Sequence, residues 1–150
     1  MRPIRLVCLA ITAIVVGAVA GFIWPARAQS YAPMDNPFSI DGIDTVCTGV
    51  GDEAQHDPRW AAYPVRIEFS NGGAQYLSGA HVDLSKAGGK SLAALDCAGS
   101  WVLFKLGPGD YKVDATLLYN QGGGTRSATF SPPGHGQKRV VLQFKLAPNQ

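Results

Sequence analysis

GSWVLFKLGPGDYKV, residues 99–113, is the stretch from which the fold of this chain is best predicted. It joins a dense apolar run at 101–106 to a second run that begins at Tyr111. Between the two, Gly107–Asp110 has the chemistry of a type II turn, because proline presets φ at the second position and glycine supplies a positive φ at the third. A tyrosine just past such a corner commonly buries its ring and hydrogen-bonds its hydroxyl to nearby backbone. Pro108, Gly109 and Tyr111 therefore predict a structural corner, and this role explains Tyr111 better than catalysis does.

Apolar and polar residues alternate at 63–70, 80–85 and 111–117, which places one face of each of these strands inward. Short strand patterns bounded by glycine, proline or asparagine occupy 43–46, 63–70, 80–85, 92–95, 101–106, 111–117, 125–130 and 139–146. The polar segment 49–60 is typical of a loop, with one helical turn at 52–55. We predict an all-β domain: a single antiparallel Greek-key β-sandwich of about seven strands, transthyretin-like or immunoglobulin-like. A parallel sheet is disfavoured because it would need helical crossovers.

Three motifs carry a resemblance to a known family. They are Ser78-Gly79-Ala80-His81-Val82, then Gly99-Ser100-Trp101, then Leu106-Gly107-Pro108-Gly109-Asp110-Tyr111. In this order they resemble the carboxypeptidase regulatory-like domain, a transthyretin-like β-sandwich with a G-A-x-V strand, a T-D-x-x-G turn and an L-x-P-G-x-Y corner. Asp96-Cys97-Ala98-Gly99 stands where that family has its T-D-x-x-G turn. The resemblance covers about 63–146 and implies a fold without an activity; the chain looks closest to small proteobacterial envelope proteins with this domain alone.

The N-terminus has the pattern of a secretion signal. Arg2 and Arg5 precede an uncharged apolar run of 18 residues, Leu6–Ile23, and Ala26-Arg27-Ala28 offers small residues where a signal peptidase needs them. We expect residues 1–28 to form a signal peptide with a helical apolar core, and cleavage to leave Gln29 first. An uncleaved inner-membrane anchor is the alternative, because such a run is just long enough to span a bilayer. Residues 29–42 are expected to be a linker before the domain at 43–150.

Removing the leader changes both the charge and the cysteine count. The 13 Lys and Arg side chains fall to 10, against 11 Asp and Glu, so the net charge becomes about −1 and argues against nucleic acid or anionic lipid as a partner. Cys8 leaves with the leader, and Cys47 and Cys97 remain. Two cysteines in an exported protein predict one disulfide, with two free thiols as the alternative. The absence of a C-x-x-C pair gives redox catalysis no support.

No catalytic, cofactor or metal constellation stands out in the sequence. The three histidines lack metal-ligand spacing, and there is no G-x-S-x-G motif. His81 and Asp83 share one strand face, and Trp60 and Tyr63 lie at a loop-to-strand boundary, so we mark these four residues as a candidate binding surface. A solvated ion pair and two core aromatics are the simpler interpretations.

These observations predict a non-catalytic module, periplasmic or secreted, that needs no cofactor. Its partner would be an unknown envelope protein, or a second copy joined through a sheet edge. One alternative is an enzyme or accessory of the transthyretin-like class that acts on a small molecule or carbohydrate, which would bring His56, His81, Arg66 and Asp83 together in a cleft. The other alternative is a membrane-tethered structural domain, which would contact the membrane only through its uncleaved leader.

Overall fold

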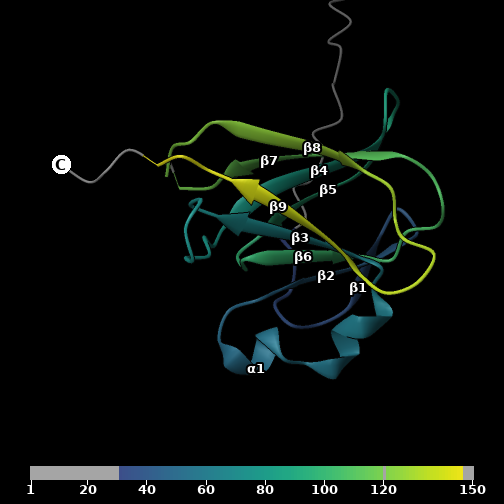
Figure 1. Cartoon of the computed structure of the whole chain (residues 1–150), viewed down its shortest axis with the longest axis horizontal. Helices are drawn as coiled ribbons and strands as arrows, with labels where there is room; N and C mark the ends of the chain where they lie inside the picture. The colour runs from purple at the N-terminus through teal and green to yellow at the C-terminus, as the bar shows by residue number, and fades with distance from the viewer. Residues whose placement is uncertain (1–30, 120, 147–150) are drawn as a thin grey trace, which may run out of the picture.

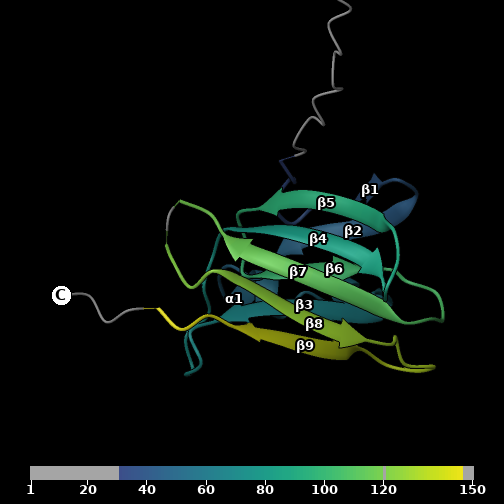
Figure 2. The same cartoon turned by 90° about the horizontal axis from the view of Figure 1, so that it is seen from above.

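The computed structural model describes residues 31–119 and 121–146, which form two β-sheets that face each other (Figures 1 and 2). The predicted leader at 1–28 lies outside the described residues. The five-stranded sheet has the order β1-β2-β6-β3-β9, and the four-stranded sheet has the order β5-β4-β7-β8. The strands are β1 (Phe38–Ile40), β2 (Ile43–Thr48), β3 (Val65–Ser70), β4 (Ala80–Lys86), β5 (Ser91–Cys97), β6 (Trp101–Phe104), β7 (Tyr111–Leu117), β8 (Thr125–Phe130) and β9 (Lys138–Gln143).

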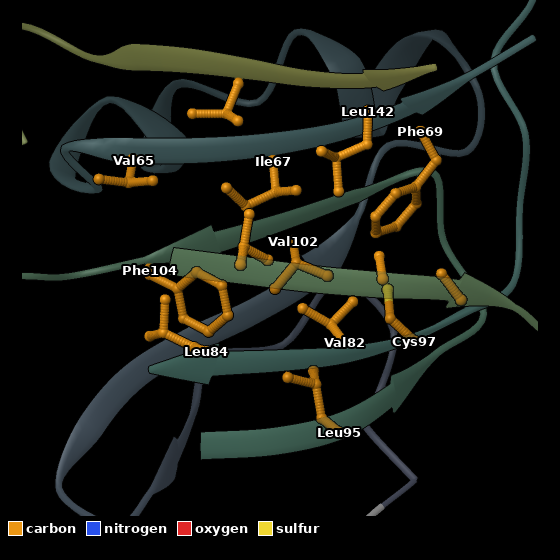
Figure 3. Packing of buried hydrophobic residues seen from close by; sticks show 14 of the residues in the cluster. Val65, Ile67, Phe69, Val82, Leu84, Leu95, Cys97, Val102, Phe104 and Leu142 are labelled. Atoms are coloured by element: carbon orange, nitrogen blue, oxygen red, sulfur yellow. The ribbon is translucent and has the colours of Figure 1, made fainter. Parts of the chain in front are cut away.

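The main core fills the space between the sheets. The alternation of apolar and polar residues along the strands fills this core, because a strand turns every second side chain inward. Ile67 and Val102 from the five-stranded sheet meet Val82 and Leu95 from the four-stranded sheet, and all four side chains are buried (Figure 3). The alternating pattern expected for these strands is therefore present, and the β-rich fold predicted from the sequence is confirmed.

A second, smaller core lies on the outer face of the five-stranded sheet. The short helix α1 (Asp52–Gln55) and the 3-10 helix η1 (Pro58–Ala62) lie on the side of that sheet away from the other sheet (Figure 1). Val46, Trp60, Tyr63 and Leu103 are buried together there. This cover explains why all four residues of β6 are buried and why its sequence is apolar without alternation.

The two sheets are joined by a disulfide. Cys47 at the end of β2 is bonded to Cys97 at the end of β5, with their Cα atoms 5.5 Å apart. The two cysteines are fully buried in the main core. The bridge predicted from the cysteine count is therefore confirmed.

The corner between β6 and β7 has the expected chemistry. Gly109 adopts a positive φ of 140°, and the Tyr111 hydroxyl donates a hydrogen bond of 3.1 Å to the Gly107 carbonyl. The Tyr111 ring is buried and stacks on Phe130, with the ring centroids 5.9 Å apart. Gly109 and Tyr111 thus form the corner between β6 and β7, and the part expected of Pro108 stays a prediction.

Two groups of expectations require correction, those on sheet topology and strand count and that on the linker. First, the sheets are not wholly antiparallel: β9 pairs with β3 in parallel, from Val65 opposite Lys138 to Ser70 opposite Gln143. A parallel pair needs a crossover, and here the intervening strands β4 to β8 provide one in place of a helix. The strand count is nine within the described residues, where about seven were expected.

Second, the described part of the expected linker, residues 31–42, packs on the domain. It contributes β1, which pairs with β2, and it forms isolated bridges from Tyr31 to Asp96 and from Met34 to Cys47. Its backbone hydrogen bonds go to the sheets, and Ala32 is buried. Within the described residues, no helix has the length and apolar character needed to cross a membrane.

Candidate functional site

Two of the four residues marked as a candidate binding surface are buried. Trp60 and Tyr63 are 3% and 7% exposed, and their rings meet edge to face with centroids 6.3 Å apart. The Trp60 indole N–H donates to the Ala54 carbonyl at 2.7 Å, which holds α1 against η1. These two aromatics therefore anchor the α1–η1 segment to the sheet, and the expectation of an exposed aromatic patch here is corrected.

The other two residues, His81 and Asp83, share the outer face of β4 but bond to different partners. His81 Nδ1 lies 2.6 Å from an oxygen of Asp96 on β5, whereas Asp83 accepts a hydrogen bond of 2.7 Å from the Ser91 hydroxyl. Each partner lies across the β4–β5 strand pair. No group of three or more potential metal ligands occurs among the residues the structure describes.

The four polar residues that an enzymatic cleft would require lie on opposite sides of the molecule. On β4, His81 and Asp83 alternate with core residues, so they face outward from the four-stranded sheet. On β3, Arg66 alternates with core residues and faces outward from the five-stranded sheet, where it lines a hollow together with His56. The structure therefore brings His56 and Arg66 together and separates them from His81 and Asp83.

That hollow has a volume of about 310 Å³ and lies between the α1–η1 segment, β3 and the loop before β9. Gln55, His56, Asp57, Trp60, Arg66 and Gln137 line it; we call it the Arg66 hollow. Gln137 fixes one wall, because its side-chain amide donates to the carbonyl oxygens of both Trp60 and Tyr63, at 3.0 and 2.9 Å. The α1–η1 segment and the loop before β9 are thus held together across the hollow.

A buried carboxylate lies beside the hollow on the same outer face. Glu68 is 1% exposed, and Arg139 on β9 binds it with two hydrogen bonds of 2.8 and 2.6 Å. This bidentate pairing raises the pKa of the Arg139 guanidinium well above its usual range. Tyr76 adds a longer hydrogen bond of 3.4 Å to the same carboxylate. Such pairing is what allows a charged side chain to be buried at this position.

Arg66 is the second guanidinium at this carboxylate. Its Nε lies 2.7 Å from a Glu68 oxygen, with the N–H not aligned for a hydrogen bond. Its guanidinium carbon lies 4.4 Å from the centre of the Trp101 ring, a cation–π arrangement. The side chain is 20% exposed. Arg66 is therefore held in place by Trp101 and Glu68 while one side remains accessible.

The sequence did not reveal this cluster. Glu68 and Arg139 are 71 positions apart, and they meet only through the parallel pairing of β3 with β9. Because local patterns do not specify register between distant strands, the one available signal was Arg66-x-Glu68, two charges of opposite sign on the outer face of a strand. Comparison with protein-family models finds no match, and comparison with curated proteins finds none either.

Proposed function

We propose that this chain is an exported, non-catalytic β-sandwich module that binds a protein partner in the bacterial cell envelope, in the periplasm or outside the cell. The proposed fold is the Greek-key, transthyretin-like sandwich of carboxypeptidase regulatory-like domains. Support comes from the signal-type N-terminus, the facing sheets, the tyrosine corner and the disulfide, a bond that persists in oxidising compartments.

The observation that carries the binding proposal is the outer face formed by β3 and β9. Two guanidinium groups, from Arg66 and Arg139, share the single carboxylate of Glu68. Val141 is 43% exposed and lies opposite Glu68 in the strand register, and the Arg66 hollow adjoins the cluster. Arginine, aromatic and exposed apolar side chains in one region are typical of protein interfaces.

Site-specific photo-crosslinking in native envelopes tests this proposal. A photoreactive residue at position 141 should capture a protein of defined mass, and the same residue at Thr129 should not. Thr129 is a suitable control because it is exposed on β8 in the other sheet. Substituting Arg139→Gln should reduce capture at 141, because it removes the exposed guanidinium beside Val141.

A strictly monomeric protein that captures nothing at either position would overturn the proposal. Equal capture at 141 and 129 would also count against it, because that result would indicate nonspecific contact.

A further inference from the structure

The Arg66 hollow has the size and composition of a small recognition site. Its volume of about 310 Å³ lies at the lower end of the range for ligand pockets, about 300–1,000 Å³. Trp60 and Ala61 contribute apolar groups to its lining, and Gln55, Asp57, Arg66 and Gln137 contribute amide and charged groups. A hollow of this size accommodates one or two residues of a peptide.

The one carboxylate that lines the hollow is already occupied. Asp57 accepts hydrogen bonds from the Arg59 backbone N–H at 2.9 Å and from the Arg59 guanidinium at 2.8 and 2.6 Å. The hydrogen bonds from the Arg59 side chain lower the pKa of the Asp57 carboxyl. Asp57 therefore remains ionised and paired, and its charge is balanced locally.

Arg66, in contrast, has guanidinium N–H groups that are available to a ligand. Glu68 is bound through two hydrogen bonds by Arg139, and the closest approach of Arg66 to it is through Nε, at 2.7 Å. Within the described part of the chain, the two terminal nitrogens of Arg66 make no hydrogen bond. Their N–H groups form the planar fork that binds a carboxylate through two parallel hydrogen bonds. Trp101 already fixes the guanidinium plane, so less conformational entropy would be lost on binding.

The amide side chains of the hollow complement a ligand that carries N–H groups. Gln55 and Gln137 donate their side-chain N–H groups to backbone carbonyls of the protein. Their side-chain oxygens accept no hydrogen bond within residues 31–119 and 121–146. Each oxygen is therefore available to accept a hydrogen bond from a ligand. One cationic fork with amide acceptors nearby fits the carboxylate and backbone N–H groups of a peptide. Inorganic phosphate also binds an arginine fork, so it serves as the competing ligand in the test below.

We propose that the Arg66 hollow binds a peptide carboxylate, with Arg66 as the anchoring residue. This inference rests on the proposed function, because it names the group of the partner protein that the module recognises. The carboxylate comes either from a C-terminus or from an acidic side chain, and the two sources share the same chemistry at Arg66.

Nuclear magnetic resonance titration of the purified, oxidised full-length protein, as processed by the expressing cell, tests the proposal. The probes are N-acetyl-Gly-Gly-Ala with a free carboxylate, its C-terminal amide, and N-acetyl-Gly-Asp-Gly-amide. We expect at least one carboxylate peptide to shift the Arg66 Nε–H and Gln137 side-chain resonances, and the amide to bind at least about tenfold more weakly. Binding of only the first peptide would indicate a C-terminus, and binding of the aspartyl peptide would indicate a side chain.

Two variants and one control locate the site. Arg66→Gln should reduce affinity at least about tenfold, and Arg126→Gln should leave it unchanged, because Arg126 lies on β8 in the other sheet. If Arg66→Gln unfolds the protein, Ala61→Glu provides an independent test: residue 61 lines the hollow and is exposed, so its new carboxylate would occupy the site without disturbing Glu68. Ala61→Glu should also abolish binding.

Three results would each overturn the carboxylate site. The first is equal affinity for the acid and amide peptides, and the second is an affinity for inorganic phosphate equal to that for the acid peptide. The third is no binding at about 10 mM peptide, a concentration at which even a very weak complex forms. Crosslinking at position 141 distinguishes the two proposals. Capture that persists in Ala61→Glu, with no peptide binding in the unsubstituted protein, would refute the carboxylate site and leave the binding module standing. Absence of capture at position 141 in the protein that carries alanine at residue 61 would refute the module itself.

Discussion

Gly99 shows how one residue permits the close approach of two strands. A Cβ at this position would overlap the carbonyl oxygen of Thr48 and lie 2.9 Å from its carbonyl carbon. Because both obstacles are backbone atoms, β2 would have to move. We predict that Gly99→Ala lowers the free energy of unfolding by at least about 2 kcal/mol, in the range of overpacking substitutions. Urea denaturation monitored by tryptophan fluorescence measures this.

Gly107 is the matched control for Gly99. A Cβ added there meets nothing within 4 Å, so Gly107→Ala should change the stability by less than about 0.5 kcal/mol. Equal effects of the two substitutions would contradict the steric explanation and would point to the general loss of glycine.

The Tyr111 hydroxyl permits a subtler test at the same scale. Tyr111→Phe keeps the stacking on Phe130 and removes only the hydrogen bond to the Gly107 carbonyl. The carbonyl is left without this donor, and we expect a loss of about 1 kcal/mol in thermal or chemical denaturation. Tyr119→Phe is the control, because that side chain is 74% exposed and should show no measurable change. A corner without energetic value would leave both variants at the stability of the parent.

At the scale of the element, the outer face of β7 links stability to pH. Partial burial raises the pKa of the Asp114 carboxyl, but hydrogen bonds from Lys112 and Ser127, together with the Lys112 charge, outweigh it and leave the pKa lowered. A lowered folded pKa contributes stability that is present above the unfolded value of about 3.9 and is lost as pH falls through the folded value. Asp114→Asn should therefore be less stable than the parent at pH 7, and the gap should close towards pH 3.

Denaturant titrations at several pH values measure this difference in stability between the parent protein and Asp114→Asn. Lys112→Gln removes a partner and keeps the carboxylate, so it should also weaken the pH dependence of stability. A gap that stays constant from pH 7 to pH 3, or widens in acid, would refute the assignment to Asp114.

The elements also show what sequence patterns could and could not predict. Alternation located β4 and β7, and turn chemistry located the Tyr111 corner, because both depend on neighbours in the chain. The three-residue strand β1 carries too little pattern to be recognised, and its proline-rich surroundings suggested a linker. The pairing of β9 with β3, and with it the contact of Arg139 with Glu68, depends on register between distant strands. The candidate site could not be predicted for that reason.

At the scale of the whole molecule, the two outer faces differ in character. The four-stranded sheet presents hydroxyl and carboxylate groups that bond to one another across strands, such as Thr116 with Thr125 and Ser127 with Asp114. The five-stranded sheet presents the Arg66 hollow and the exposed Arg139. A face whose polar groups are already paired has less to offer a partner. This contrast supports the proposed binding surface on the five-stranded side, and self-association through a sheet edge remains a prediction for sedimentation or light scattering.

The disulfide and the leader can be tested together by counting thiols. The bridge closes a loop with a sequence separation of 50, and in the chain-entropy account its loss would cost about 4 kcal/mol. Protein purified from the envelope, denatured but not reduced, should show no free thiol, because the expected cleavage after Ala28 would remove Cys8 and the bridge holds the other two cysteines. One free thiol would mean a retained leader with an intact bridge, and would favour the tethered alternative. Two would mean a cleaved leader without the bridge, contradicting an oxidising destination. Intact mass corresponding to a chain that begins at Gln29 must agree with the thiol count, since neither measurement alone separates processing from oxidation.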